Sequence, residues 1–177
     1  MFLLALACSP APYAWDLPAH IPPPAIPDDN PMSTAKVDLG RRLFYDTQLS
    51  VDGDMSCASC HEQALAFTDG KARGVGTTGA VHPRGAMSLT NVAYASRLAW
   101  ANPQLGSLEV QAMLPLFGEE PVEMGLTDVL LVERLSASPQ HVRWFSQVWP
   151  EADDAISVAN TVAAIASFQR TLLSFTS

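Results

Sequence analysis

Three residues in the first half of the chain have the types and the spacing that covalent haem attachment requires. Cys57 and Cys60 are three positions apart and His61 follows directly, so on one helical turn all three project from the same side. Two thiols in this arrangement can add to the two vinyl groups of a haem while the imidazole binds the iron. The C-x-x-C-H pattern therefore predicts one haem c, attached at Cys57 and Cys60 and ligated by His61.

Two other uses of a cysteine pair fit the sequence less well. A zinc site needs four ligands at suitable spacing, and the remaining histidines, His20, His82 and His141, are not adjacent to the motif. A thioredoxin-like redox pair needs a βαβ context, and no β-rich alternation is present. Because haem is attached covalently outside the cytoplasm, the motif also predicts export.

The motif leaves the sixth coordination position of the iron undecided. A methionine or histidine in that position gives an electron carrier, whereas an open position permits chemistry. The downstream methionines are Met87, Met113 and Met124. An electron-transfer cytochrome c with His/Met ligation is therefore an alternative on residue types alone, and core packing is the ordinary role of each methionine.

The composition is that of one acidic globular domain. The chain has 177 residues, a slightly positive mean hydropathy and a formal net charge of 10 − 18 = −8. This length suits a single domain with a hydrophobic core. The negative charge disfavours nucleic acid as a partner and would tolerate a basic protein.

The first residues read as a leader. Residues 1–8 are apolar and end at Cys8, which is similar to the end of a lipoprotein signal, although the basic region and the longer apolar stretch of a complete signal are absent. We interpret them as a truncated signal and expect a periplasmic protein, with lipid anchoring through Cys8 as an option. A stray cysteine in a short leader is the alternative.

Proline dominates residues 9–31, which we expect to be extended because proline lacks a backbone donor and has a fixed φ. The domain proper spans residues 32–177, and its apolar periodicity predicts an all-α fold. Helices are expected from Asn30 or Ser33, at about 89–99, from Ser107, near 126–137 and 139–149, and from about Asp154.

Several segments together resemble the bacterial diheme cytochrome c peroxidase and MauG family. They are LGRRLFYDTQLS (39–50), SCASCHEQALAFTDG (56–70), HPRGAMSLTNVAY (82–94), SLEVQAMLPLFGEEPVEMGL (107–126) and IASFQRTLLS (165–174). The stretches around WDLP, IPDDNPMSTAKVDLG and WANP are similar to the branch encoded beside copper-binding partners, which includes the methanobactin-operon diheme enzyme.

The resemblance implies a cytochrome c-like fold and an oxidoreductase that reacts with hydrogen peroxide. Family members have a second haem and a second C-x-x-C-H in their C-terminal half, whereas this sequence has one motif. We therefore expect the chain to be the N-terminal, peroxide-reactive haem domain of a truncated sequence, which lacks its C-terminal haem domain. A genuine monohaem protein and an inactive fragment are the alternatives.

The resemblance also assigns roles on the side of the haem that peroxide reaches. There Gln111 would hydrogen-bond peroxide, and Pro115 would keep the iron face closed to a strong ligand. Glu123 would take and return the proton that peroxide moves between its two oxygens before the O–O bond breaks. Two extra residues within LFGEE make Glu119 or Glu120 alternatives, although the PVEM context favours Glu123.

Four more residues are matched by the resemblance. Trp100 matches a tryptophan that carries electrons between the two haems, with aromatic packing as its alternative. Asn91 matches a position that helps to bind calcium through its amide oxygen, with a helix N-cap as its alternative. Arg84 is the expected partner of a haem propionate. His82 matches a loop histidine that binds iron in some members, but HPRG favours a loop or propionate-side role.

The family further implies a partner protein. The partner would be a redox protein or a protein substrate, and in the copper-associated branch we expect the oxidised side chain to be a tryptophan. This expectation rests on analogy with the branch.

Overall fold

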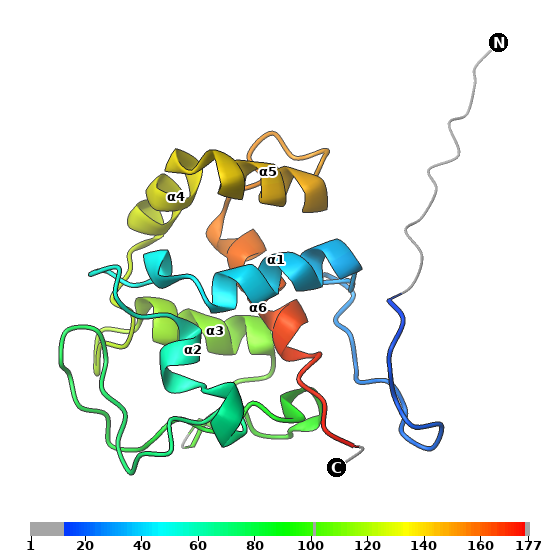
Figure 1. The fold of residues 1–177 in the computed structure, drawn as a ribbon, viewed down its shortest axis with the longest axis horizontal. Helices are drawn as coiled ribbons and strands as arrows, with labels where there is room; N and C mark the ends of the chain where they lie inside the picture. The colour runs from blue at the N-terminus through cyan, green and yellow to red at the C-terminus, as the bar shows by residue number, and fades with distance from the viewer. Residues whose placement is uncertain (1–12, 101, 176–177) are drawn as a thin grey trace.

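The computed structural model describes residues 13–100 and 102–175 (Figure 1). Its helical elements are α1 (Thr34–Phe44), η1 (Thr47–Leu49), α2 (Cys57–Cys60), η2 (Gln63–Leu65), η3 (Val92–Tyr94), α3 (Leu108–Phe117), α4 (Asp128–Ala137), α5 (Pro139–Val148) and α6 (Val158–Gln169). Within these ranges only isolated β-bridges occur and no strand forms. The all-α fold is therefore confirmed, while the leader and Cys8 lie outside the described residues.

Serine side chains begin the helices that pack around the centre of the molecule. The Oγ atoms of Ser33, Ser107 and Ser157 each accept a hydrogen bond from a backbone N–H in the first turn of α1, α3 and α6. Such caps satisfy donors that the helix itself leaves unpaired. Because Ser157 provides the cap, α6 begins at Val158 and not near Asp154.

The stretch 89–99 does not form the helix that its apolar pattern predicts, and that expectation was wrong. Only the short η3 forms, after Asn91 at φ +58°. Asn91 is bonded to a distant segment, since its N–H donates to the Leu172 oxygen at 2.7 Å and its Oδ1 accepts from the Ser174 N–H at 2.7 Å. Tertiary hydrogen bonds thus replace the helical ones.

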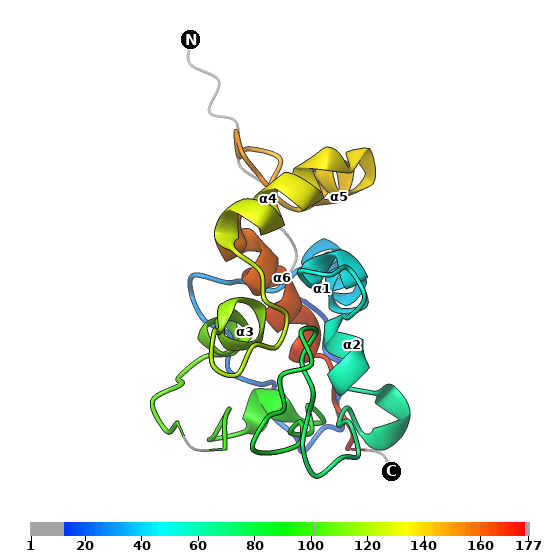
Figure 2. The same cartoon turned by 90° about the vertical axis from the view of Figure 1, so that its left-hand side faces the viewer.

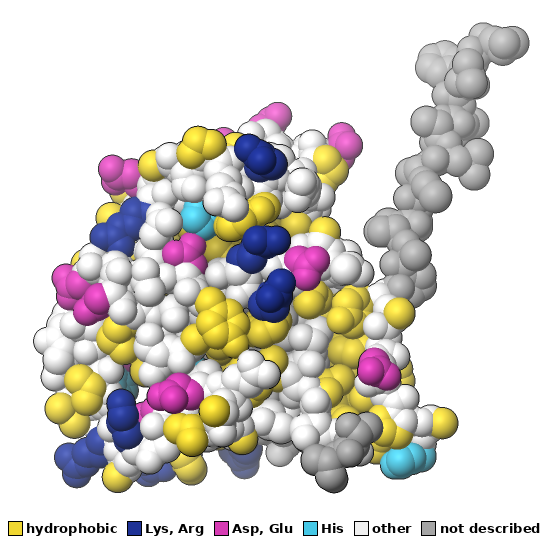
Figure 3. All heavy atoms as spheres, in the orientation of Figure 1, with side chains coloured by type: hydrophobic (Ala, Val, Ile, Leu, Met, Phe, Trp, Pro, Cys, Tyr) yellow, Lys and Arg dark blue, Asp and Glu magenta, His cyan; other side chains and the backbone are white. Residues whose placement is uncertain are grey.

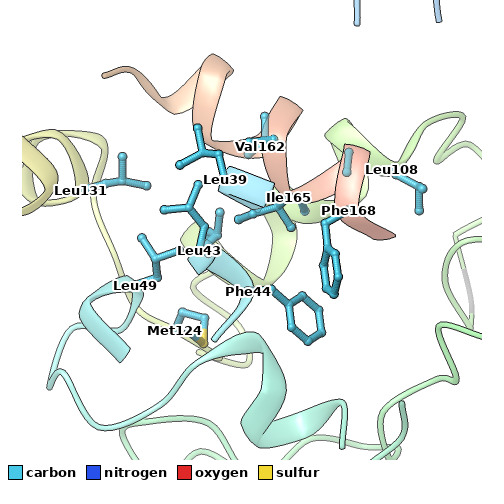
Figure 4. Packing of buried hydrophobic residues seen from close by; sticks show 14 of the residues in the cluster. Leu39, Leu43, Phe44, Leu49, Leu108, Met124, Leu131, Val162, Ile165 and Phe168 are labelled. Atoms are coloured by element: carbon cyan, nitrogen blue, oxygen red, sulfur yellow. The ribbon is translucent and has the colours of Figure 1, made fainter. Parts of the chain in front are cut away.

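Helices α1 and α6 cross at the centre of the molecule (Figure 1), and their facing side chains form the core (Figure 4). Gly40 of α1 lies at the crossing, where a Cβ would come within 1.9 Å of the Ala164 oxygen in α6. The close approach therefore requires glycine. The buried apolar side chains beside it include Leu39, Leu43, Phe44, Ile165 and Phe168.

Replacing Gly40 by alanine should destabilise the fold, although alanine is normally the better helix former by about 1 kcal/mol. The added methyl group must displace backbone, so we expect the free energy of unfolding to fall by about 1–3 kcal/mol. Urea denaturation measures it. Gly106→Ala is the matched control, because no atom lies within 4 Å of its Cβ position; equal effects of the two changes would contradict the close approach.

The proline-rich segment, residues 13–31 of the described chain, lies across one side of the helices (blue in Figure 1). The Tyr94 hydroxyl donates to the Pro22 oxygen at 2.6 Å. The Asn30 amide donates to Oε1 of Glu109 in α3 at 2.6 Å and to a backbone oxygen of α6 at 3.0 Å. These bonds fasten the extended segment to the domain.

A buried ion pair joins α3 to the end of α6. Arg170, which is 4% exposed, donates from Nη1 and Nη2 to the two carboxylate oxygens of Glu109 at 2.7 and 3.0 Å. Two parallel bonds fix the relative position of the groups as well as their distance. The pair therefore sets the spacing of two helices that supply walls of the cavity described below.

A second buried pair joins α5 to the turn after α1. Nε2 of His141 lies 2.7 Å from Oδ2 of Asp46. Burial works against ionisation of Asp46, but the hydrogen bonds from His141 and from the Gln48 N–H outweigh it, so the pKa of Asp46 lies below its ordinary value. A group with a lowered pKa stabilises the fold in its ionised form.

Asp46→Asn should lower the melting temperature at neutral pH, and this difference should shrink in acid. The carboxylate contributes stability above its unfolded pKa of about 4, and that contribution is lost as the pH falls through the lower folded pKa. Thermal unfolding of the two proteins between about pH 7 and pH 3 measures the difference. The exposed Asp153 gives the control variant, Asp153→Asn. A difference that stays constant down to the lowest pH would contradict the prediction.

Candidate haem site

A cavity of about 360 Å³ contains the haem-attachment motif. Residues of α2, of α3 and of the glycine-rich loop (residues 74–86) line this cavity, and Figure 2 shows the loop between the two helices. Most of the wall is apolar, as a haem requires. Among the apolar lining residues are Met55, Leu89, Val92, Leu98, Leu108, Leu116 and Ile165.

Helix α2 is a single turn that presents both cysteines to this cavity. Its start is held by the Ser56 N–H, which donates to Oγ of Ser59 at 3.0 Å. Cys57 and Cys60 are not joined to each other, and burial raises the pKa of both thiols, that of Cys57 to about 12. Two unpaired thiols that line one cavity are available for thioether bonds to one ligand.

The imidazole of His61 is held in the tautomer that binds a metal. Its Nδ1 lies 2.8 Å from the Phe67 oxygen, and because a carbonyl only accepts, Nδ1 carries the proton and Nε2 keeps its lone pair. Ala66 and Phe67 have φ values of +55° and +58°, which are costly for residues with a Cβ. This turn aims the carbonyl at His61. Burial also lowers the pKa of His61, which favours the neutral ligand.

Arg134 of α4 fixes the segment that leads into the motif. Its guanidinium donates to the backbone oxygens of Gln48 at 3.2 Å, of Val51 at 2.6 Å and of Ser50. Three carbonyls held by one side chain leave this turn little freedom. The position of α2 therefore depends on α4, which is far from it in sequence.

The opposite wall carries the residues that the resemblance assigns to peroxide chemistry. Gln111 and Pro115 lie one turn apart on α3 and line the cavity, and so does Glu123 in the loop that follows. Glu119 and Glu120 are exposed and are not among the lining residues. The structure thus brings Gln111, Pro115 and Glu123 together and places the two alternative carboxylates elsewhere.

The glycine-rich loop reaches across the cavity to the backbone beside Glu123. A Cβ at Gly76 would come within 1.9 Å of the Val122 oxygen, so the loop can dock this closely only with glycine. The Thr77 N–H donates to the backbone carbonyl oxygen of Glu123 at 2.8 Å. This contact fixes the loop, residues 74–86, relative to the cavity wall that carries Gln111, Pro115 and Glu123, called the distal wall below.

His82, on the return arm of this loop, lies beside Glu123. Its Nδ1 is 3.8 Å from Oε1 of Glu123, and the exposed fractions of the two side chains are 15% and 43%. Glu123 is the more exposed because it faces the open cavity, while the surrounding protein removes much of its hydration. Burial raises the pKa of Glu123 and His82 acts in the opposite direction. Sequence reasoning favoured a loop or propionate-side role for His82 and missed this pairing.

The polar atoms of the wall fit a bound haem. Asp69, His82 and Gln169 line the cavity, and the buried atoms Oδ2 of Asp69, Nε2 of His82 and Oε1 of Gln169 have no hydrogen-bond partner within the described residues. Buried polar atoms without partners are costly in an empty apolar cavity and are typical of a site that receives a polar ligand group. Together with the two thiols and the imidazole, they make the residues present suitable for haem c.

Trp100 lies at the mouth of the cavity. Its side chain is 58% exposed, and its Nε1 donates to the Gly85 oxygen at 3.0 Å. The Arg84 guanidinium is 5.6 Å from the centre of the indole ring. Arg84 and Trp100 therefore form one edge of the site, in contact with each other and with solvent.

The mouth is basic although the chain as a whole is acidic. Residues 70–108 contain no Asp or Glu, and Figure 3 shows Lys and Arg side chains gathered along the lower edge of the molecule. The cations of this stretch are Lys71, Arg73, Arg84 and Arg97, of which Arg84 and Arg97 line the cavity. Such an edge suits the carboxylates of haem propionates.

The remaining residues predicted to bind iron or calcium do not all lie on the cavity wall. Met87 and Met124 both line the cavity, Met124 as part of the core, whereas Met113 packs against the core without lining the cavity. Asn91 donates from Nδ2 to the Ser174 oxygen at 3.3 Å and accepts from its N–H. In the described ranges no group of three or more His, Cys, Asp or Glu side chains could hold a metal ion.

Sequence reasoning missed Asp69, Arg97 and Gln169 on the cavity wall. Oδ1 of Asp69 accepts from the N–H groups of Lys71 and Ala86, each at 3.1 Å, and so ties the two ends of the loop together. The only available signal was an acidic residue before a glycine, which is typical of any turn. The positions of Asp69, Arg97 and Gln169 on the cavity wall depend on which distant segments the fold brings together, so local sequence does not reveal them.

Comparisons with known proteins agree with this site. A family model described as di-haem cytochrome c peroxidase matches residues 34–177. The methylamine utilization protein MauG of Methylorubrum extorquens is 38% identical over 148 residues, 84% of this chain and 41% of that protein. Cytochrome-c peroxidase IdrP1 of Denitromonas iodatirespirans is 40% identical over 158 residues, 87% of this chain and 40% of that protein.

A solved structure extends the similarity to three dimensions. The crystal structure of a MauG-like protein associated with microbial copper homeostasis matches with a TM-score of 0.88 and 49% identity, over 92% of this chain and 47% of that chain. The chain spans less than half the length of each of these relatives. No helix in residues 13–100 and 102–175 is long and apolar enough to cross a membrane. Since the match covers nearly the whole domain, the chain belongs to the di-haem cytochrome c peroxidase and MauG family.

Proposed function

We propose that this chain is a haem c oxidoreductase domain that reacts with hydrogen peroxide. The observation that carries the proposal is that one cavity is lined both by the haem-attachment residues and by Glu123. Cys57 and Cys60 lie on α2, His61 follows it, and Glu123 lies in the loop after α3. A haem bound there supplies the redox chemistry, and the protein sets ligation, proton transfer and access.

The residues of the distal wall have different roles in the proposed reaction. The Glu123 carboxylate accepts a proton from peroxide and returns it to the departing oxygen, and the Gln111 amide orients the peroxide by hydrogen bonding. Pro115 brings no donor or ligand to this part of the cavity wall. Its place on α3, one turn after Gln111, leaves the space beside Glu123 free for a small substrate.

The role of Trp100 follows from its place at the mouth. An indole that lines the cavity and also reaches solvent can pass electrons between the site and a partner. We infer that the partner is a second haem domain, because the chain spans only 40% to 47% of the relatives named above. A protein side chain is the proposed final substrate, by analogy with the MauG relatives.

Location and calcium binding belong to the proposal as well. We infer a periplasmic protein, with lipid anchoring through Cys8 as an option, from the haem motif and the apolar leader. The Asn91 amide oxygen accepts one hydrogen bond from Ser174 and has a second lone pair for calcium. Cell fractionation tests the location, and a calcium-dependent rise in melting temperature that Asn91→Ala removes tests the ion.

Mixing the haem-loaded ferric protein with hydrogen peroxide tests the proposed function. The absorption spectrum of the protein should be high-spin before mixing and should change within the mixing experiment. The rival function is a His/Met electron carrier, for which Met87 and Met124 are the downstream methionines on the cavity wall. A sulfur-to-iron charge-transfer band without any reaction toward peroxide would establish the carrier and refute the enzyme.

A further inference from the structure

The cavity holds a second titratable group whose use the proposed chemistry leaves open. Nδ1 of His82 faces Oε1 of Glu123 at 3.8 Å, and Nε2 of the same ring is buried without a hydrogen-bond partner in the described chain. His82 and Glu123 both line the cavity, so a largely buried imidazole lies beside the carboxylate where a substrate would bind.

The loop holds this imidazole in place through its backbone. The His82 N–H donates to the Gly74 oxygen at 2.9 Å, and the Gly76 N–H donates to the Ala80 oxygen at 2.9 Å. At the loop tip, the contact of Gly76 and Thr77 with the backbone at Glu123 completes the arrangement. The same short hairpin therefore carries His82 and docks on its partner, so the distance between the two side chains is fixed by local structure.

Few charged groups compete with His82 for influence on Glu123. His82 from the loop is the charged group that lowers the pKa of Glu123, while Glu123 in turn raises the pKa of the two cysteine thiols, which thioether bonds to a haem would remove from titration. Gln111, on α3, is neutral. Other charged groups on the surrounding elements include Asp52 and Asp54 near Thr77, Asp69, Arg84 and Arg97 on the cavity wall, Lys71 and Arg73 at the mouth, and the exposed Glu119 and Glu120.

We propose that His82 is a positioning residue for Glu123, whose imidazole beside the carboxylate favours the ionised form of Glu123 within the cavity. Held as a carboxylate, Glu123 can accept a proton from hydrogen peroxide and return it to the departing oxygen. The inference rests on the peroxide reactivity proposed above and adds the residue that keeps Glu123 ready for it.

The direction of the effect follows from the two influences on the pKa of Glu123. Burial raises this pKa and His82 lowers it. In His82→Asn only the burial remains, so Glu123 becomes protonated at a higher pH than in the wild type.

Infrared spectroscopy of carbon monoxide on the ferrous, haem-loaded protein tests this without peroxide turnover. The C–O stretch responds to the charge of the groups around the ligand, and in the wild type it should change with pH as Glu123 titrates. In His82→Asn the change should move to higher pH by about 1 unit or more, and in Glu123→Gln it should disappear. His20→Asn, the same substitution at an exposed histidine, should match the wild type.

Three results would overturn the inference. They are a wild-type stretch that does not change with pH, a change that survives in Glu123→Gln, and a change that keeps its wild-type pH in His82→Asn. Should His82→Asn fold poorly by thermal unfolding, His82→Gln gives the same comparison with a longer amide. A protein that shows the His82-dependent shift but does not react with peroxide would refute the proposed function and leave the pairing intact.

Discussion

The double variant Cys57→Ala, Cys60→Ala should contain no covalently bound haem, whereas the wild type should contain one haem per chain. Both thiols line the cavity, are unpaired, and flank the position that His61 offers to iron. Without them nothing holds the haem once the protein unfolds, and we expect an all-or-none loss. Mass spectrometry of the denatured protein, or haem staining after denaturing electrophoresis, measures it.

The control for this experiment is Cys8→Ala. Cys8 belongs to the leader and not to the C-x-x-C-H motif, so its replacement should leave the covalent haem in place. Each single variant, Cys57→Ala or Cys60→Ala, should retain at most one thioether bond. Covalent haem in the double variant at the wild-type level would contradict the assignment of the motif.

Glu123→Gln should slow the reaction of the haem-loaded protein with hydrogen peroxide by about 10²–10⁴-fold, the usual contribution of a positioned acid–base group. Glutamine preserves the size of the side chain and its hydrogen bonding but cannot take up a proton. Burial raises the pKa of Glu123, which brings the group closer to the pH at which proton transfer in both directions is efficient. Stopped-flow absorption after mixing with peroxide gives the rate constant.

Glu120→Gln is the matched control for the slowed reaction. Glu120 lies in the same loop but is exposed and does not line the cavity, so its rate constant should equal that of the wild type. A rate constant unchanged in Glu123→Gln and reduced in Glu120→Gln would reassign the role to the other carboxylate. The two extra residues within LFGEE made Glu120 an alternative to Glu123 in the sequence analysis, and this comparison decides between them.

Local sequence patterns were enough to predict the cofactor and most of the helices. The spacing of Cys57, Cys60 and His61 is a property of one helical turn, and the caps at Ser33 and Ser107 involve residues three positions apart. Such features depend on short stretches of chain, so the residue types alone specify them.

Features made by distant segments could not be predicted in the same way. The helix expected at 89–99 failed because Asn91 pairs with the backbone at Ser174, and no periodicity reports such a pairing. His82 was assigned away from Glu123 because the docking of Gly76 on Val122 is not visible in the sequence. Apolar patterns predict burial, but the partner of a loop is decided by tertiary packing.

The spin state of the ferric, haem-loaded protein tests the central claim most directly. His61 would hold the iron of a bound haem, and Glu123 and Gln111 line the same cavity without offering the iron a strong ligand. Electron paramagnetic resonance of the ferric protein should therefore give a high-spin signal. A purely low-spin signal that His82→Asn, Met87→Ala or Met124→Ala converts to high spin would show a histidine or methionine on the iron and would contradict an iron face left open to substrate.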